Sequence, residues 1–354
     1  MRHAPLNSRA DAPAAPAPGA TVADVGERAI ISRLRARVPA HPAWTLIGIG
    51  DDAAVVEPVR GALEVLTTDG LVEGVHFDAR FSSPFDVGWK ALAVNLSDIA
   101  SMGAAPRAAL LSLALPPSFA VDAVDGLIDG FLALAADARV TLAGGNITRS
   151  PGPLIVDVAL TGAVRRRDVL RRGAAKPGDA VFVTGSLGAG LAGLQFLRSR
   201  AGQDVAGTND EMRTCVERYR RPAPRYRIGA LLGRARAANA CMDLSDGLAD
   251  AARQIAESSG VGVRIDGNAL PIDEDARRWF EAQGGDPVSS AAAGGDDYEL
   301  LFTVPRKRTG RLRHVVQHGR GVPITRIGEI TARREAVLMR EGSPEPLPAG
   351  FVHF

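Results

Sequence analysis

The sequence predicts an α+β protein of two domains, in which helices pack on mostly antiparallel or mixed sheets. Its 354 residues are enough for two medium-sized buried cores. Helical and strand-like apolar patterns both occur, yet they do not alternate strictly as they do in consecutive βαβ units. Near residue 165 a connector is followed by a second set of predicted strands and helices. No repeat of 20–50 residues is evident. We therefore expect layered α+β domains that meet close to that position.

Three helices are predicted in the first half, at residues 24–38, 84–102 and 121–138. In the first of them Ile30, Leu34 and Val38 share one face, and Asp24 is the candidate N-cap. Short apolar runs predict strands at residues 45–50, 53–56, 63–68, 140–145 and 154–162.

The second half begins with a predicted connector at residues 165–178. After it we expect strands at 180–185, 261–265 and 298–304, a glycine-containing helix start at 186–194, a helix at 222–235 and a strand–turn–helix unit at 241–257. Three regions result: an Ala- and Pro-rich disordered tail (1–22), an N-terminal domain (23–165) and a C-terminal domain (166–354).

Composition excludes several classes of function. A net charge of +2 predicts no broad basic surface for nucleic acid. No apolar run approaches the roughly 20 residues that span a bilayer, so no membrane association is expected. Cys215 and Cys241 have neither metal nor redox spacing, which is typical of a cytoplasmic protein. Lysines account for only three of the 42 Lys and Arg residues, so arginine is expected to bind any phosphate.

Aspartates recur beside apolar strands and in turns of small residues. They are Asp51, Asp52, Asp69, Asp98, Asp243, Asp246, Asp296 and Asp297. A single Asp is explained by turn formation or helix capping. Several carboxylates beside buried strands are costly unless they share a cation. Oxygen ligands without His or Cys indicate Mg²⁺, and Thr67 and Thr68 add hydroxyl oxygens. Asn95 and Asp98 are three positions apart on the second helix and share a face.

Two glycine-rich turns are candidates for phosphate binding. Residues 144–146 follow a predicted strand, and residues 185–188 lie between a strand and a helix. Each signal is weak by itself, because glycine turns are common and a purely structural turn is the more frequent explanation. The Walker A pattern and the protein-kinase motifs are absent. His76, beside an acidic motif, is either a packed side chain or a substrate contact.

In order, the segments GIGDDAAVV, TTDGLVEGVHF, KALAVNLSDIASMGAAP, LRRGAAKPGD, DLSDGL and GGDDYELLFTV resemble the thiamine-monophosphate kinase family over residues 24–354. The resemblance implies an aminoimidazole ribonucleotide synthetase-like fold and a homodimer formed through the sheet of the N-terminal domain. It also implies that ATP lies between that domain and an α/β-layered C-terminal domain that completes the nucleotide and substrate site.

The resemblance further implies a role for individual residues. The implied metal ligands are Asp52, Thr67, Thr68, Asp69, Asp98, Asn146, Asp243 and Asp246. The implied ATP contacts are Gly145, Asn146, Arg171 and Ser245, and the implied substrate contacts are His76, Asp296 and Phe351. Two positions depart from the family pattern: Asn146 stands where an aspartate is common, and Asp296 where a glutamate is common.

The expected reaction is in-line transfer of the γ-phosphoryl group of ATP to thiamine monophosphate with several Mg²⁺ ions. The acceptor phosphate is already ionised, so no general base is expected. One alternative is another enzyme of the superfamily. Aminoimidazole ribonucleotide synthetase is possible on fold alone, but the pairing of GIGDDAAVV with VEGVHF argues against it. Selenophosphate synthetase needs a reactive Cys or selenocysteine near its N-terminus and the hydrogenase maturation enzyme a C-terminal Cys, and this sequence has no Cys before residue 215 and ends in Phe354. The other alternative is a catalytically silent nucleotide or metal sensor, which the retained aspartates disfavour.

Overall fold

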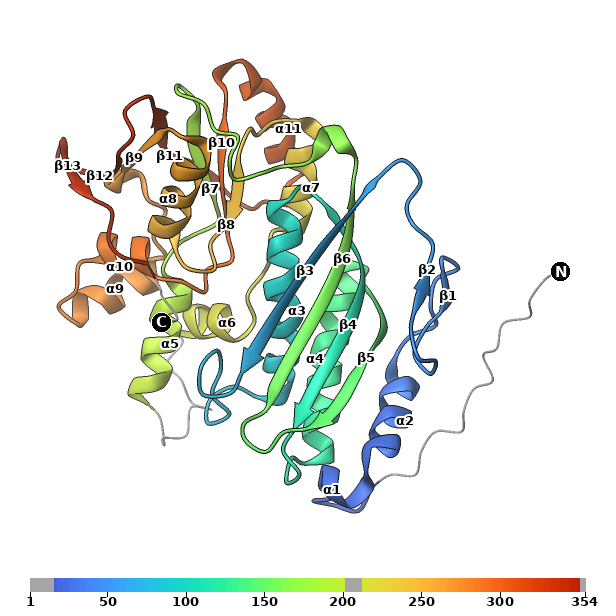
Figure 1. Cartoon of the computed structure of the whole chain (residues 1–354). Helices are drawn as coiled ribbons and strands as arrows, with labels where there is room; N and C mark the ends of the chain where they lie inside the picture. The colour runs from blue at the N-terminus through green and yellow to red at the C-terminus, as the bar shows by residue number, and fades with distance from the viewer. Residues whose placement is uncertain (1–15, 201–211, 351–354) are drawn as a thin grey trace. The chain divides into compact units, whose positions relative to one another are not determined.

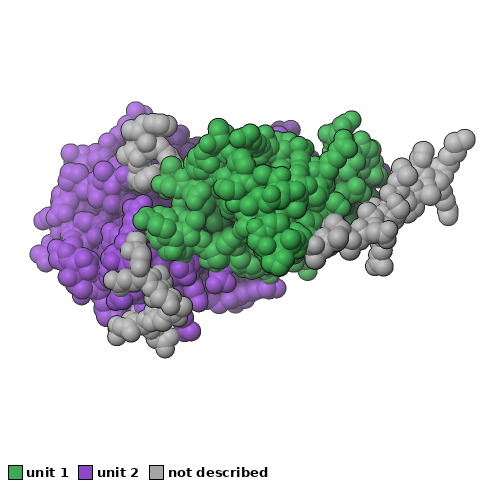
Figure 2. Space-filling view, turned by 90° about the horizontal axis from the view of Figure 1, so that it is seen from below, with its two compact units in different colours: residues 1–57, 70–91, 109–158 green, residues 58–69, 92–108, 159–354 purple. Residues whose placement is uncertain are grey.

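The computed structural model of the chain describes residues 16–200 and 212–350. Two compact units are distinguished in Figure 2: unit 1 comprises residues 1–57, 70–91 and 109–158, and unit 2 comprises residues 58–69, 92–108 and 159–354. Most of the predicted tail and the predicted substrate contact Phe351 lie outside the described residues. Within the described part, Val121 N donates to Ala20 O and Val22 N donates to Phe119 O, both over 2.9 Å.

The helices and strands are labelled as in Figure 1. Up to residue 168 they are α1 (Val22–Val25), α2 (Glu27–Arg37), β1 (Thr45–Ile47), β2 (Val55–Val56), β3 (Leu63–Val72), α3 (Pro84–Ser101), β4 (Ala105–Leu115), α4 (Val121–Ala138), β5 (Thr141–Arg149), β6 (Ile155–Val164) and the 3₁₀ helix η1 (Arg166–Asp168). Beyond it they are β7 (Ala180–Thr184), α5 (Ala189–Ser199), α6 (Arg213–Arg220), α7 (Tyr226–Ala235), β8 (Cys241–Asp243), α8 (Leu248–Ser259), β9 (Gly262–Asp266), η4 (Gly267–Ala269), α9 (Glu274–Ala282), α10 (Pro287–Ala293), β10 (Leu300–Val304), η5 (Arg306–Arg308), α11 (Thr309–His318), β11 (Ile324–Thr331), β12 (Ala336–Arg340) and β13 (Ser343–Pro346).

The first predicted helix is divided in two. Gly26 has a φ of 76°, which L-residues rarely adopt, and it separates α1 from α2. Asp24 is therefore not the N-cap of a long helix. It lies inside α1, where its carboxylate accepts the backbone N–H of Thr21 over 2.8 Å. Thr21 is the N-cap of α1 and forms a capping box with Asp24, which explains why an acidic residue is favoured at position 24.

Strands β3 and β5 run well beyond their predicted ends, and β4, β11, β12 and β13 were not predicted. β3 continues through Asp69 to Val72, and β5 continues to Arg149. Residues 144–146 consequently lie within β5 and do not form the predicted glycine turn. β4 was not predicted because its run of Ala and Leu has helical rather than strand propensity.

The four strands β3, β6, β4 and β5 form one sheet in that order. Within unit 1, α2 and α4 pack against β5 and against each other. α3 and α4 approach closely because two glycines lack side chains. A Cβ on Gly88 would lie 1.8 Å from Leu127 O, and a Cβ on Gly130 would lie 1.9 Å from Phe85 O. Backbone-to-backbone packing of this kind holds the two helices in one register.

Unit 2 contains a seven-stranded sheet in the order β13-β12-β9-β11-β7-β10-β8. Its strands pair antiparallel except for β12 with β9, as the predicted mixed sheet requires. α8 packs against β8, β9, β10 and β12 (Figure 1). Ile255 of this helix belongs to a buried apolar cluster with Val183, Ile265 and Leu301 of the sheet. Burial of these side chains is the main stabilising contribution to the unit.

Candidate active site

Three elements of unit 2 bring predicted metal ligands together. On β3, Thr67 donates its hydroxyl to the carboxylate of Asp98 on α3. The preceding helix residue, Ser97, donates its hydroxyl over 2.8 Å to Asp243 at the end of β8. Ser97 and Asp243 are both buried. The site therefore presents hydroxyl and carboxylate oxygens from segments that are far apart in the sequence.

The charges in this cluster repel one another. Burial and, after it, the nearby charge of Asp98 raise the pKa of Asp243 to about 7, although the hydrogen bond from Ser97 opposes both effects. Bringing a carboxylate into low dielectric next to another carboxylate disfavours its charged form. A cation beside Asp243 and Asp98 would relieve this repulsion.

Asn95 links α3 to β3 near a further predicted ligand. Its side-chain amide donates over 3.4 Å to the backbone oxygen of Asp69. The prediction that Asn95 and Asp98 share a helix face is confirmed, because both contact β3. Asp69 itself lies inside the strand and not at its end. The role of Ser97 was missed because nothing in its local sequence indicates contact with β8.

Tyr298 lies among three of the predicted acidic residues. Its hydroxyl donates over 3.0 Å to Oδ1 of Asp296. Burial raises the pKa of Tyr298, and the carboxylates of Asp296, Asp243 and Asp69 raise it further. The phenol therefore remains a proton donor at neutral pH. Sequence reasoning singled out Asp296 and overlooked Tyr298, although both belong to the same motif.

The turn between β8 and α8 carries Ser245 and Asp246, a predicted ATP contact and a predicted metal ligand. Both are partly buried. The backbone N–H of Asp296 donates to Ser245 O over 2.9 Å, and that of Tyr298 donates to Leu244 O over 3.1 Å. The DLSDG and GGDDYEL motifs are thus neighbours in space.

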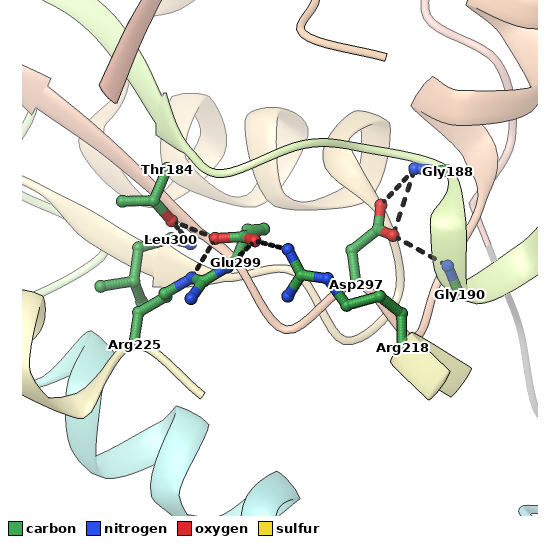
Figure 3. A network of polar contacts seen from close by, with 8 residues as sticks. All are labelled: Thr184, Gly188, Gly190, Arg218, Arg225, Asp297, Glu299 and Leu300. Atoms are coloured by element: carbon green, nitrogen blue, oxygen red, sulfur yellow. Dashed lines mark hydrogen bonds and ion pairs between the residues drawn. The ribbon is translucent and has the colours of Figure 1, made fainter. Parts of the chain in front are cut away.

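The glycine-rich turn at residues 185–188 does lie between a strand and a helix, but its donors are already engaged (Figure 3). Gly188 N donates to both carboxylate oxygens of Asp297, over 3.1 and 2.8 Å, and Gly190 N donates over 3.3 Å. A helix N-terminus attracts an anion. Here that anion is a side chain of the protein, so the phosphate-binding interpretation of these donors is wrong. Burial raises the pKa of Asp297 to about 7, against the effect of the two N–H donors.

Next to Asp297, the fully buried carboxylate of Glu299 is neutralised by two arginines. Glu299 accepts hydrogen bonds from Thr184 Oγ1 over 2.6 Å, from Arg225 Nε over 2.5 Å and from Arg218 over 3.3 Å. Its side chain is 0% exposed. This network connects the end of β7 and the α6–α7 region to the GGDDYEL segment, of which Glu299 is part.

Two further predicted residues of unit 2 lie at the surface. Arg171 is exposed, and its backbone oxygen accepts the N–H of Cys241 over 3.1 Å at the start of β8. Thr68 on β3 is also exposed. Both side chains are accessible to a ligand in solution.

The remaining predicted residues belong to unit 1. Asp52, Gly145 and Asn146 are exposed. A Cβ on Gly145 would lie 1.9 Å from Leu111 O, so the close approach of β4 explains this glycine without a nucleotide. His76 is partly buried and accepts the backbone N–H of Val72 at Nδ1 over 3.1 Å. A neutral ring with this contact carries its proton on Nε2.

The donor set of the cluster suits a hard cation. Among residues 16–200 and 212–350, no three His, Cys, Asp or Glu side chains are arranged to hold a metal ion. Mg²⁺ typically uses only one or two protein carboxylates and completes its shell with waters and substrate phosphates. Asp98, Asp243 and the hydroxyl of Thr67 provide donors of that kind.

Comparison with known proteins defines the class. The AIR synthase related protein N-terminal domain matches residues 50–164, and the corresponding C-terminal domain matches residues 176–340. Fold and site thus describe a two-domain protein of the AIR synthase-related class. Over the described part of the chain, none of the helices has the length and apolar character needed to cross a membrane.

The relatives narrow this class further. Thiamine-monophosphate kinase of Escherichia coli K12 is 38% identical over 333 residues, covering 93% of this chain and 98% of that protein. The crystal structure of thiamine-monophosphate kinase from Stenotrophomonas maltophilia K279a has a TM-score of 0.78 at 36% identity, covering 89% of this chain and 96% of that one. AaThiL complexed with AMPPCP and TMP has a TM-score of 0.74 at 34% identity, covering 86% and 92%. The chain belongs to the thiamine-monophosphate kinase family.

Proposed function

We propose that this protein transfers the γ-phosphoryl group of ATP to thiamine monophosphate, giving thiamine diphosphate and ADP. The observation that carries the proposal is the meeting of Asp98 and Asp243 with the hydroxyl donors Thr67 and Ser97 in a chain that matches thiamine-monophosphate kinases over most of its length. The backbone of Asp69 is bonded to Asn95 on the same helix. The related AaThiL structure, which holds AMPPCP and TMP together, supports both substrates, since AMPPCP is an analogue of ATP.

In this proposal the acidic residues act through Mg²⁺, which neutralises charge on the two phosphate groups when it is bound. Thr67 orients the carboxylate of Asp98, and Ser97 orients that of Asp243. The acceptor oxygen belongs to an ionised phosphate, so the protein supplies position and electrostatics and no general base.

The roles of the other residues follow the family pattern and form part of the same proposal. They are metal binding by Asp52, Thr68, Asn146 and Asp246, ATP binding by Gly145, Arg171 and Ser245, and substrate binding by His76, Asp296 and Phe351. We further propose a cytoplasmic homodimer with the domain boundary near residue 165.

The test is a parallel assay of the purified protein with Mg-ATP and one of three acceptors: thiamine monophosphate, thiamine, or the aminoimidazole precursor. We expect chromatography to detect thiamine diphosphate and ADP in equal amounts with thiamine monophosphate alone. Turnover of free thiamine without turnover of its monophosphate would contradict the proposal. ATP hydrolysis that is independent of the acceptor would also count against it.

The same assay separates the alternatives. An AIR synthase-related enzyme of different specificity would consume the aminoimidazole precursor. A silent sensor would release no ADP with any acceptor, although it would still bind ATP in a calorimetric titration. An Asp98→Asn preparation, purified in the same way, controls for contaminating kinases.

A further inference from the structure

The segment that carries Asp296 has an unusual backbone. Asp296 and Tyr298 have φ angles of 64° and 50°, in the left-handed region that residues other than glycine rarely adopt. Such a backbone conformation is energetically unfavourable and persists only where surrounding contacts maintain it. Strained backbone of this kind is often found at ligand sites.

The left-handed backbone at Asp296 and Tyr298 is maintained by contacts from the start of α5 and from the turn after β8. Asp297, between the two strained residues, accepts the N–H groups of Gly188 and Gly190. The backbone N–H groups of Asp296 and Tyr298 are bonded to the turn after β8. With its backbone held in this way, Asp296 retains freedom mainly at its side-chain torsions.

Those torsions are constrained by Tyr298. The phenol hydroxyl donates to Asp296 Oδ1 over 3.0 Å, and the Tyr298 side chain is buried. Burial, then Asp296, and last the nearby carboxylates of Asp243 and Asp69 raise the pKa of this hydroxyl, so it keeps its proton. Like charges would push the Asp296 carboxylate away from this position if no donor held it.

We infer that Tyr298 is a positioning residue that orients the carboxylate of Asp296 toward the bound acceptor substrate. The inference rests on the proposed function, in which Asp296 contacts thiamine monophosphate. A carboxylate held in one orientation complements the cationic thiazolium ring without the entropic cost of ordering a mobile side chain on binding.

The substitution Tyr298→Phe removes only the hydroxyl and leaves the ring and the backbone conformation in place. We expect the KM for thiamine monophosphate to rise about tenfold, because a hydrogen bond to a charged group is lost. The kcat should stay within about twofold and the KM for ATP should not change, since the lost interaction acts equally on bound substrate and transition state. Tyr226→Phe is the matched control, because this buried tyrosine on α7 accepts a hydrogen bond from Arg227 and has no assigned role in the site.

A double-mutant cycle with Asp296→Asn distinguishes positioning from a structural effect. If Tyr298 acts through Asp296, the double variant should have the same KM for thiamine monophosphate as Asp296→Asn alone. Additive effects, or an unchanged KM in Tyr298→Phe, would overturn the inference. A drop in Tm well beyond that of Tyr226→Phe would also overturn it, by assigning the hydroxyl to folding. Wild-type protein that fails to phosphorylate thiamine monophosphate contradicts the proposed function instead, so the two failures are distinct.

Discussion

Single carboxylates in this protein differ sharply in what surrounds them. Asp243 is buried beside Asp98, whereas Asp297 is buried against backbone N–H groups. The first arrangement accumulates negative charge that a cation can neutralise, and the second is complete within the protein. Residues of the same type therefore have different predicted roles: Asp98 and Asp243 in metal binding, and Asp297 in stability.

Asp98→Asn tests the metal role. We expect turnover to fall at least tenfold, because a ligand charge near the phosphates is removed while the acceptor oxygen for Thr67 remains. Initial rates should be measured at saturating and at limiting Mg²⁺, with Tm measured in parallel. Asp122→Asn, at an exposed position on α4, is the control and should behave as wild type. Wild-type rates for Asp98→Asn at limiting Mg²⁺ would refute the role.

Asp297 gives a prediction for the pH dependence of stability. Its pKa is about 7 in the folded protein, against an ordinary value of 3.8, so the unfolded chain releases this proton first as pH rises. Its contribution to the free energy of unfolding is complete below pH 3.8, declines up to about pH 7 and is constant above it.

The substitution Asp297→Asn removes this titration and keeps an oxygen acceptor for Gly188 and Gly190. The stability of wild type relative to the variant should therefore fall between pH 4 and 7, by at most about 1.4 kcal/mol per pH unit. Denaturant unfolding of both proteins between pH 4 and 8.5 measures this difference. A difference that does not vary with pH would show that Asp297 does not titrate in this range.

At the scale of elements, Glu299 joins three parts of unit 2. It lies immediately before β10 and contacts Thr184 at the end of β7 and two arginines from the α6–α7 region. Figure 3 shows these side chains converging on one carboxylate, with Asp297 to its right in the view. The buried carboxylate of Glu299 thus links the GGDDYEL segment to β7 and to the α6–α7 region through hydrogen bonds and ion pairs.

Glu299→Ala should destabilise the protein by roughly 3–5 kcal/mol, because it leaves partly buried arginine charge without its partner. The control is Glu329→Ala. Glu329 pairs with Arg264 over 3.3 Å, but the two side chains are 47% and 45% exposed. An exposed pair contributes at most about 1 kcal/mol. The free energy of unfolding of both variants measures the contrast, and equal losses would argue against the fastening role of Glu299.

At the scale of the whole molecule, exposed apolar side chains bear on whether two chains form a dimer. Large apolar side chains are exposed on β1–β4 and near them: Leu46, Ile47, Val55, Val59, Leu63, Leu66 and Leu110. Exposed apolar side chains typically mark an interface where they form a contiguous patch. The family resemblance predicts a two-fold dimer formed through the N-terminal sheet, which would cover such side chains.

Light scattering on the eluted protein should therefore give twice the chain mass of 37.0 kDa. Leu66, which is 74% exposed on β3, provides the test variant, and Leu66→Glu should shift the mass toward one chain. The control Val316→Glu alters a side chain that is 46% exposed on α11 and should leave the mass unchanged. A single-chain mass for wild type at micromolar concentration would refute the dimer.

Much of this architecture is local in origin. The helices at residues 84–102 and 121–138 and the strand–turn–helix at 241–257 were predictable, because their periodicity and glycine punctuation act within a few turns of chain. The first helix and the glycine turn at 144–146 were predicted wrongly. A positive φ at Gly26 and the extension of β5 outweighed the local pattern there.

The sequence by itself determined the family, the α+β class and the set of acidic residues from which the site is built. Only the tertiary structure decided which of them meet: Asp243 with Ser97, Asp98 with Thr67, and Asp296 with Tyr298. It also assigned Asp297 to the N-terminus of α5, where the sequence had offered a bound phosphate as a candidate beside a purely structural turn. The physical reason is that desolvation and charge repulsion depend on neighbours contributed by distant segments, which local periodicity does not encode.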